Sequence, residues 1–151
     1  MSAAPSDLTD HLGYRLRQVS NHVSQAFARK LADRQVTVAE WVLMRTLHGQ
    51  DPIAPSQLAA RMGLTRGAIT KLADRLVEKA LLARVANPDD GRAQTLSLTE
   101  RGAAFVPELA ALADRNEAEC FDHLSPDDRA TLSRILTQTI DRLGLRAPPV
   151  D

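Results

Sequence analysis

A short stretch in the middle of the chain carries side chains whose types and spacing favour recognition chemistry. Thr65 can cap a helix that begins there, because its hydroxyl can accept a hydrogen bond from a free backbone N–H of the first turn. Arg66 and Thr70 lie four residues apart, and Lys71 and Arg75 repeat that spacing. We expect Arg66 and Thr70 to contact the edges of DNA bases, and Lys71 and Arg75 to contact phosphates.

The residues around this stretch predict a helix-turn-helix. Pro55 suits the first position of a helix, since its missing N–H is not needed there. Gly63 suits the left-handed residue that ends the same helix. The seam between the two helices is supplied by apolar residues: Leu58, Ala59, Met62, Leu64, Ile69, Leu72 and Leu76. The start of the second helix is then free to face outward, as a recognition helix does when it enters a major groove.

Two short strands around a charged turn follow the second helix. Residues 82–86 and 94–98 are predicted to be strands, the second with clear apolar and polar alternation. The run 87–93 between them contains Asp-Gly and predicts a turn. A hairpin in this place is a wing, and Arg92 near its tip can enter a narrow minor groove, which attracts a guanidinium. We expect Asp90 to orient an arginine of the wing or of the recognition helix.

The ordered series formed by residues 64–79, 81–82, 88–92 and 96–102 resembles the core signature of the MarR family. Members of this family are small, dimeric, winged-helix bacterial transcription regulators. The resemblance implies a mainly α fold with a small β-hairpin wing, in which a winged helix-turn-helix is joined to a helical dimerisation region. It also implies double-stranded DNA as a partner, bound at a pseudo-palindromic operator. The implied DNA-binding residues are Thr65, Arg66, Gly67, Ala68, Thr70, Lys71, Arg75, Asp90 and Arg92.

Two positions depart from the family pattern. Ala80 stands where the family usually has glycine after the recognition helix, and a left-handed backbone there would cost alanine roughly 1 kcal/mol relative to glycine. We expect a locally adjusted turn at this point. Pro107 lies inside the helix that begins near Thr99, and it predicts a kink or an interruption there.

The segments on either side of the winged part are predicted to be long amphipathic helices. Thr37 and Glu40 have the spacing of a capping box, and Ser125 followed by Pro126 suits the start of the last helix. The first helix, residues 7–34, carries an apolar stripe at Leu8, Leu12, Leu16, Val19, Val23, Phe27 and Leu31. The last helix is expected to bury Leu132, Ile135, Leu136, Ile140 and Leu143.

These elements predict a division of the chain. Residues 37–99 form the winged helix-turn-helix DNA-binding domain, residues 1–36 and 100–147 form the helical dimerisation region, and residues 148–151 form a tail. Neither terminal helical region has another large layer in its own chain to cover its apolar stripe. A second copy of the chain is therefore expected to cover it, with the first, fifth and sixth helices forming a two-fold dimer. The alternative is that these helices fold against the wing within a monomer.

Length, composition and charge agree with this interpretation. The chain has 151 residues, of which 44% are hydrophobic and 3% aromatic, so the core must be built mainly of aliphatic side chains. Its longest apolar runs are too short to predict a transmembrane span or a signal peptide. The formal net charge is zero, but residues 55–102 hold eight basic and five acidic residues. Positive charge therefore gathers where the motif predicts that DNA docks.

The cysteine and histidine residues suggest no catalytic or metal chemistry. Cys120 is the single cysteine, which excludes an internal disulfide and suits a reducing cytoplasm. MarR relatives that sense peroxide place their reactive cysteine early in the first helix, where this chain has Gly13 and Tyr14. We therefore expect Cys120 to be a buried structural residue. No two histidines have the i, i+4 spacing of metal ligands, so no metal, cofactor or enzyme activity is expected.

A polar stripe runs beside the apolar stripe of the first helix, at His11, Arg15, Gln18 and His22. Such a stripe is usually a solvated face. The resemblance offers a second interpretation, because MarR regulators often bind small aromatic acids between the dimer helices and the winged domain. Arg15 would then pair with the carboxylate, in a cleft between the first and second helices. The implied ligand-binding residues are His11, Tyr14, Arg15, His22 and Trp41, with Tyr14 and Trp41 as aromatic walls.

The sequence thus predicts a cytoplasmic, homodimeric DNA-binding regulator, namely a repressor released by a small aromatic carboxylate effector, with no membrane partner. The competing interpretation is a ligand-independent architectural DNA-binding protein or a winged-helix interaction protein. A response of DNA binding to a small aromatic acid would distinguish the two.

Overall fold

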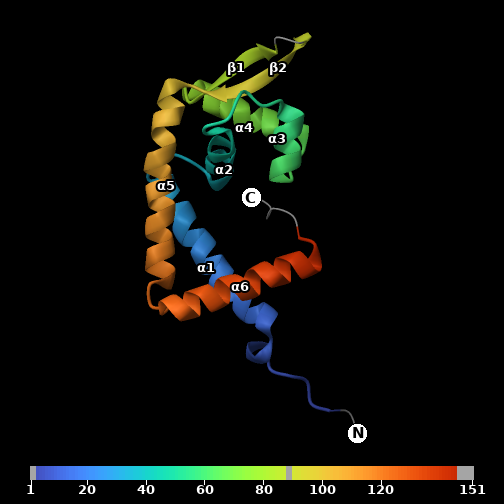
Figure 1. Ribbon diagram of the computed structural model, residues 1–151, viewed down its shortest axis with the longest axis vertical. Helices are drawn as coiled ribbons and strands as arrows, with labels where there is room; N and C mark the ends of the chain where they lie inside the picture. Colours follow the sequence, from blue (N-terminus) through green and yellow to red (C-terminus); the bar gives the residue numbers. More distant parts are fainter. Residues whose placement is uncertain (1–2, 88–89, 146–151) are drawn as a thin grey trace.

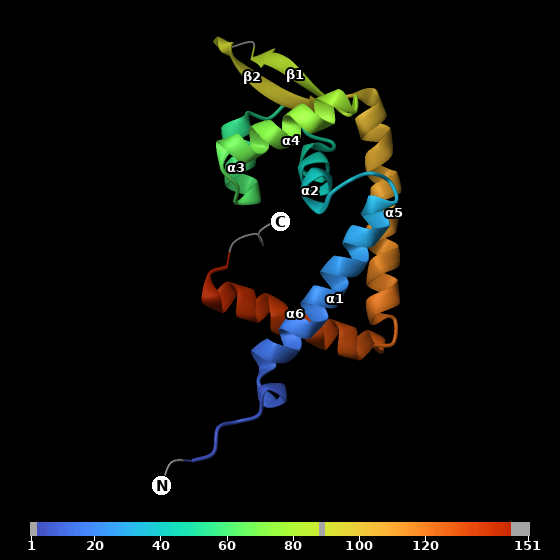
Figure 2. The ribbon, with the colours of Figure 1, turned by 180° about the vertical axis from the view of Figure 1, so that it is seen from behind.

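Helices α2, α3 and α4 and a β-hairpin form one end of the molecule, and the long helix α5 connects them to α1 and α6 at the other end (Figures 1 and 2). The computed structural model describes residues 3–87 and 90–145, the side chains of residues 90–93 excepted. In order, its elements are η1 (Leu8–Asp10), α1 (Leu12–Ala32), α2 (Val38–Leu47), α3 (Pro55–Met62), α4 (Arg66–Glu78), β1 (Leu82–Asn87), β2 (Asp90–Leu98), α5 (Glu100–Phe121) and α6 (Pro126–Leu143). The mainly α fold with a two-stranded wing is confirmed. Among the described residues, no helix is long and apolar enough to cross a membrane.

The helix starts marked by capping residues fall where the sequence predicts them, whereas the first helix, predicted over residues 7–34, is divided at His11 into η1 and α1. Pro55 is at the first turn of α3, and Gly63 ends that helix in the left-handed region with φ 66°. Thr37 and Glu40 form both hydrogen bonds of a capping box at α2. Thr99 and Ser125 cap α5 and α6 by accepting from backbone N–H groups three residues further on. Side-chain caps therefore satisfy N–H groups that the first turns leave unpaired.

The wing is longer than its sequence predicts. Strands β1 and β2 pair antiparallel from Leu82↔Leu98 to Asn87↔Asp90, with a register shift between Ala86 and Asn87. Asn87 and residues 90–93 were predicted to lie in the turn, but their backbone belongs to the strands, and Asn87 pairs with Asp90. The remaining predicted turn residues 88 and 89 lie outside the described part of the chain. A further backbone bridge, which no pattern in the sequence predicts, joins Ile53 to Leu96 with N–O distances of 3.0 and 2.8 Å.

The core lies beneath the helix-turn-helix and is built of aliphatic side chains. It includes Leu31, Val36, Leu43, Met44, Leu47, Ile53, Leu58, Ala59, Met62, Ile69, Leu72, Ala73, Leu76, Leu81, Leu82, Leu96, Val106 and Leu109. The predicted seam between α3 and α4 is confirmed, with Leu64 at its half-buried edge. This packing fixes the outward face of α4, because the buried face of the helix cannot turn away without opening the core.

The helices at the other end leave much apolar surface uncovered. In α6 no residue is buried, so the prediction that this helix buries its apolar residues is wrong for the single chain. Its exposed residues are Leu132 (38%), Ile135 (47%), Leu136 (40%), Ile140 (46%) and Leu143 (63%). In α1 the apolar stripe is buried only at Leu31, half-buried at Val23 and Phe27, and exposed at Leu12, Leu16 and Val19; Leu8, in η1, is exposed as well.

The two departures from the family pattern are accommodated without a change of fold. Ala80 takes the left-handed conformation with φ 60°, so the adjusted turn that we expected does not form. The backbone accepts the unfavourable conformation because Leu81 and Leu82, which follow it, are buried in the core. Helix α5 is continuous from Glu100 to Phe121 with Pro107 inside it, so the proline does not interrupt the helix.

Candidate nucleic-acid interface

The first two turns of α4 present polar and basic side chains to solvent. Thr65 caps the helix, with its Oγ1 accepting from the Ala68 N–H at 3.1 Å. Thr70 donates its hydroxyl to the Arg66 carbonyl at 3.0 Å, which ties it to the helix and leaves acceptor capacity on the oxygen. Ala68 is half-buried, whereas Thr65, Arg66, Gly67, Thr70, Lys71 and Arg75 are exposed. The N-cap and outward face of α4 therefore carry all seven of the predicted residues from this part of the chain, with Arg75 in the last turn.

The positive charges on this face are not neutralised within the chain. Arg66, Lys71 and Arg75 make no side-chain hydrogen bond or ion pair with any residue that the structure describes. Arg61 on α3 is likewise exposed and unpaired among those residues. Unpaired guanidinium and ammonium groups on one face can neutralise phosphates and release the counterions of DNA.

An ion pair connects the wing to α4. The Arg84 guanidinium of β1 donates to the carboxylate of Asp74, on the outward side of α4. Within the wing, the Thr95 hydroxyl donates to the Val85 carbonyl at 3.0 Å. The backbone of Asp90 and Arg92 belongs to β2, but their side chains lie outside the described part of the chain. Asp74 thus pairs with one wing arginine, Arg84, and the role predicted for Asp90 stays a prediction.

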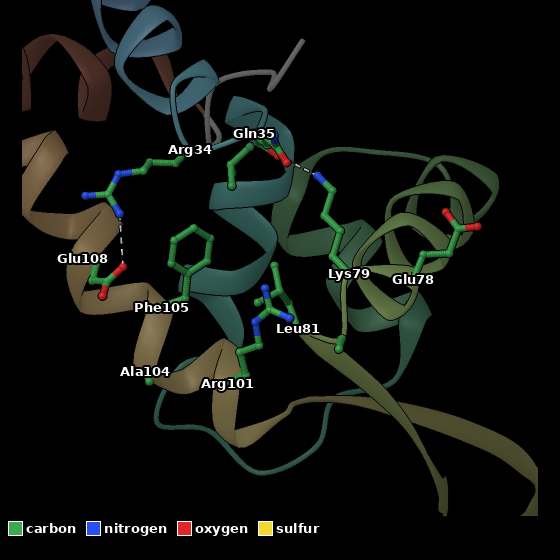
Figure 3. Close-up of a pocket in the computed structure, with 11 residues that line it drawn as sticks. Arg34, Gln35, Glu78, Lys79, Leu81, Arg101, Ala104, Phe105 and Glu108 are labelled. Atoms are coloured by element: carbon green, nitrogen blue, oxygen red, sulfur yellow. Dashed lines mark hydrogen bonds and ion pairs between the residues drawn. The ribbon is translucent and has the colours of Figure 1, made fainter.

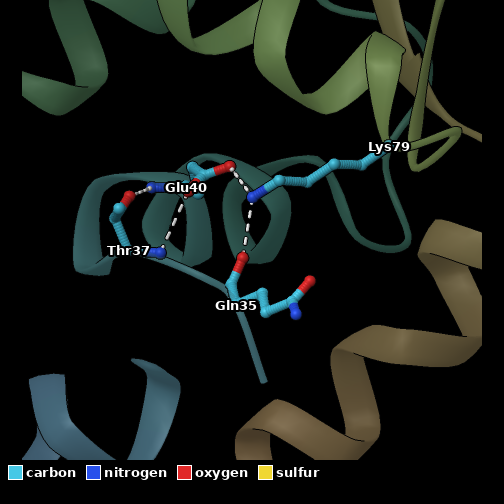
Figure 4. Close-up of polar contacts among 4 residues, drawn as sticks. All are labelled: Gln35, Thr37, Glu40 and Lys79. Atoms are coloured by element: carbon cyan, nitrogen blue, oxygen red, sulfur yellow. Dashed lines mark hydrogen bonds and ion pairs between the residues drawn. The ribbon is translucent and has the colours of Figure 1, made fainter. Parts of the chain in front are cut away.

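The C-terminal end of α4 is fixed to the start of α2 (Figure 4). The Lys79 ammonium donates to Glu40 Oε2 at 2.8 Å and to the Gln35 carbonyl at 2.7 Å. The Glu40 side chain is 2% exposed, and its other oxygen accepts from the Thr37 N–H at 3.0 Å. Burial raises the pKa of the Glu40 carboxyl, but the hydrogen bonds from Lys79 and Thr37 outweigh it and hold this pKa below its ordinary value of 4.5.

The same end of α4 is also joined closely to α5. Thr99 donates its N–H to the Leu81 carbonyl at 3.1 Å and its hydroxyl to the Ala80 carbonyl at 2.7 Å. A Cβ atom on Gly102 would lie 2.1 Å from the Leu81 carbonyl oxygen, so only glycine fits there. The base of the recognition helix is therefore held by α2 on one side and by α5 on the other.

The residues predicted to bind a ligand do not form one site. Arg15 and His22 line an open hollow of about 770 Å³ beside α5 and α6, rather than a cleft between α1 and α2. Tyr14 and His11 are not among its lining residues. Trp41 packs edge-on against Phe27, with ring centroids 6.2 Å apart, at the margin of the core. The lining of this hollow is mostly apolar and belongs to the uncovered surface of α1 and α6.

Cys120 lies in the same hollow and is half-buried, so the prediction of a buried cysteine is wrong for the single chain. Among the described residues, no group of three His, Cys, Asp or Glu side chains has the geometry to hold a metal ion. Sequence reasoning missed the Asp74–Arg84 and Glu40–Lys79 pairs, because their members are ten and 39 positions apart on different elements. The capping-box spacing predicted that Glu40 caps a helix, but it did not predict the pairing of Glu40 with Lys79.

A helix-turn-helix followed by an antiparallel hairpin, with unpaired basic side chains at the start of its second helix, defines a winged-helix DNA-binding fold. The model of the MarR family matches residues 36–93, which run from just before α2 into β2. The chain is thus similar to transcription regulators of the MarR family in sequence and in fold.

Known members resemble the chain along most of its length. The HTH-type transcriptional repressor NicR from Pseudomonas putida is 24% identical over 137 residues, which cover 91% of this chain and 87% of NicR. The multiple antibiotic resistance protein MarR from Escherichia coli is 27% identical over 130 residues, which cover 85% of this chain and 90% of MarR.

Solved structures agree with the fold. A crystal structure of a mutant of the Escherichia coli MarR complexed with operator DNA has a TM-score of 0.76 and 27% identity, covering 89% of this chain and 99% of that chain. A structure of Bordetella bronchiseptica BpsR, which concerns regulation of its DNA binding by 6-hydroxynicotinic acid, has a TM-score of 0.78 and 23% identity. It covers 91% of this chain and 99% of that chain.

Proposed function

We propose that the chain is a cytoplasmic, homodimeric repressor that binds a pseudo-palindromic operator through α4 and the wing, and that a small aromatic acid releases it. The observation that carries the DNA-binding part is the set of exposed basic side chains on α4 that have no partner among the described residues. The contacts of Lys79 with Glu40 and of Leu81 with Thr99 fix the C-terminal end of α4. They therefore hold the basic face of this helix in one orientation.

The residues at this interface take different roles. Arg66 and Thr70 read base edges in the major groove, and Lys71 and Arg75 bind phosphates. Thr65, Gly67 and Ala68 let the helix start approach the DNA backbone, where its free N–H groups can bind phosphate. Arg92 enters the minor groove and Asp90 orients it, beside the Asp74–Arg84 pair that holds the wing.

The dimer is supported by the uncovered apolar surface of α1 and α6. The exposed side chains on these helices include Leu12 (74%), Leu16 (53%), Ile135 (47%) and Leu143 (63%), a pattern that marks an interaction surface. Helices α1, α5 and α6 of a second copy would cover it and give a two-fold assembly. One recognition helix per chain then predicts half-site centres about 34–36 Å apart.

The effector is supported by the relatives and by the position of Arg15. The BpsR structure concerns an aromatic acid, and Arg15 lines a hollow with Gln18 and His22. A guanidinium pairs bidentately with a carboxylate, so Arg15 is the proposed anchor. His11, Tyr14 and Trp41 could complete such a site only through a partner or a rearrangement. The effector lowers operator affinity by its preference for the DNA-incompetent state, for which about 5–150-fold is an ordinary coupling.

Operator binding tests the first part of the proposal. A footprint on the DNA that flanks the gene for this chain supplies the operator, and titrations at several salt concentrations then compare variants. Arg66→Ala should cost about 1–3 kcal/mol and relax sequence preference at one position. Lys71→Ala should weaken all sequences alike and flatten the salt dependence. Arg45→Ala, which removes an exposed arginine from α2, is the control and should leave binding unchanged. Operator binding that is unaffected by Arg66→Ala and Lys71→Ala would overturn this interface.

The effector is tested separately with 6-hydroxynicotinate and salicylate. Each is titrated calorimetrically, and its effect on operator affinity is measured for wild type and Arg15→Ala. The variant should keep ligand-free operator binding and lose the ligand response. Equal ligand binding by wild type and variant would exclude Arg15 as the anchor, and it would leave the DNA interface untouched.

A further inference from the structure

Helices α1 and α5 carry different parts of the molecule and are joined by their packing. Helix α1 packs against α5 over its C-terminal half and diverges from it toward its N-terminus (Figures 1 and 2). Its N-terminal half bears part of the uncovered apolar surface, at Leu12, Leu16 and Val19. The residue before α5, Thr99, is bound to the end of the α4 segment. The way in which α1 lies on α5 therefore sets the position of the uncovered surface relative to the recognition helix.

Asn116 is a buried polar residue of α5 that faces α1. It is 4% exposed, and it is the one buried polar side chain of these two helices among the described residues. Its Nδ2 donates to the Val23 carbonyl at 3.1 Å, and its Oδ1 accepts from the Lys30 ammonium at 3.0 Å. Lys30, which is 13% exposed, also pairs with Glu119 at 2.7 Å. These four residues form the Asn116 cluster.

The cluster requires a side chain that both donates and accepts. A lysine ammonium only donates and a backbone carbonyl only accepts, so the Asn116 amide has one orientation in which both bonds form. Val23 and Lys30 lie seven residues apart, about two helical turns or about 10 Å along α1. Lys30 reaches back to Asn116 because helical side chains lean toward the N-terminus of their helix. One side chain of α5 thus binds α1 at two levels.

The other contacts between α1 and α5 do not select one register. The apolar residues of α1 from 19 to 31 repeat every four positions, so a shift by one turn would keep apolar contact. The Arg34–Glu108 pair links the turn after α1 to α5 at 3.3 Å (Figure 3). Its side chains are 48% and 57% exposed, and such pairs contribute little. A shift would leave the buried Asn116 amide without these partners, which is unfavourable.

We infer that Asn116 is a positioning residue for operator binding, which fixes the register of α1 on α5 and thereby the separation of the two recognition helices in the dimer. Buried polar side chains at helix–helix contacts specify register in this way, at some cost in stability. The effect on the operator rests on the proposed function. The register itself is a property of one chain, so the two are tested separately.

Electron paramagnetic resonance measures the register without DNA. The substitutions Arg17→Cys on α1 and Glu100→Cys on α5, both at exposed positions, carry spin labels in a Cys120→Ser background. Labelled protein is diluted into an excess of unlabelled protein, so that distances within one chain dominate. We expect a narrow distance distribution in this parent, and a broader or shifted one in Asn116→Leu and in Lys30→Met. The double variant should broaden no further, because both changes remove the same contact.

Loss of the cluster should not unfold the chain. In Asn116→Leu the Val23 carbonyl keeps its hydrogen bond within α1, and Lys30 keeps Glu119, so the melting temperature should stay close to that of the parent. Asn21→Leu makes the same change at an exposed position of α1 and should leave the distance distribution unchanged. An unchanged distribution in either folded variant, Asn116→Leu or Lys30→Met, overturns the inference.

Operators of different spacing test the consequence for DNA binding. Unlabelled wild type and Asn116→Leu are titrated with operators whose half-sites are moved apart or together by one base pair. Wild type should prefer one spacing, and the variant should lose about two- to thirtyfold of that preference, the range in which single residues modulate coupling between distant sites. Equal spacing preference in both proteins contradicts the positioning role. Wild type that binds no operator overturns the proposed function, and the distance measurement still decides the register.

Discussion

The Lys79 ammonium lies 2.8 Å from the Glu40 carboxylate, and this pair joins the last residue of the recognition-helix segment to the first turn of α2. The carboxylate is almost fully buried, whereas the lysine is 37% exposed. Without Lys79 the buried Glu40 carboxylate would have no cationic partner, which is strongly unfavourable. The pair therefore fixes the end of the recognition helix against α2.

Replacing Lys79 with methionine should destabilise the protein by about 1–3 kcal/mol, because it leaves the buried Glu40 carboxylate without its cationic partner. The free energy of unfolding in urea measures the effect. Lys71→Met is the matched control, since Lys71 is exposed and has no partner among the described residues. Equal stability of the two variants would show that the pair contributes nothing.

The contribution of Glu40 should depend on pH. Its folded-state pKa lies below 4.5, so the unfolded chain takes up the proton first as the pH falls. The stabilisation is therefore complete above the unfolded-state pKa and is lost as the pH falls through the folded-state value. The difference in unfolding free energy between wild type and Glu40→Gln should shrink as the pH is lowered from neutral to below 4.5. A difference that stays constant over this range would contradict the assignment.

Gly102→Ala should destabilise the protein by about 1–3 kcal/mol or more, because the new methyl group would overlap the Leu81 carbonyl and force the α4–α5 junction apart. Gly67→Ala is the control. Its methyl group would meet only Thr65 Oγ1 at 3.9 Å, so alanine should be neutral or favourable in that helix. Urea unfolding of the two variants should move in different directions, and a tolerated Gly102→Ala would mean that the junction is not tight.

Ala80→Gly should stabilise the protein by about 1 kcal/mol, since glycine adopts the left-handed conformation of this residue without a steric penalty. The same substitution at Ala60, an exposed position in α3, should destabilise by a similar amount because a helix interior favours alanine. Thermal unfolding of both variants checks the sign. Loss of stability in Ala80→Gly would mean that the backbone there is not left-handed.

The parts of the fold that depend on neighbouring residues were predictable from sequence. Pro55, Gly63, Thr65 and Thr99 mark helix ends through hydrogen bonds and backbone angles within a few residues of themselves. The side chains on the first turns of α4 were predictable for the same reason, because a cap and a 3.6-residue period fix which positions face outward.

The parts that depend on distant residues were not predictable. Asp74 finds Arg84 only once the hairpin folds over α4, and no local pattern distinguishes it from Asp90. The strands extend to Asn87 and Asp90 because cross-strand pairing overrides the turn preference of those residues. Arg15 and Trp41 were predicted to line one ligand site, but Arg15 lines the hollow beside α5 and α6, whereas Trp41 packs against Phe27. The tertiary packing of α1 decides this, and no local pattern reports it.

Helix α6 has no buried side chain in its own chain, although it spans Pro126–Leu143. An isolated helix of this size is marginal in water, so most of its order must come from what covers it. If the chain forms the proposed dimer, the helix content of α6 depends on dimerisation. It should therefore increase with the concentration of the protein. A newly synthesised chain would remain incompletely folded until it met a second one. Degradation of such solitary chains by cellular proteases would then set a rate of synthesis below which the protein does not accumulate.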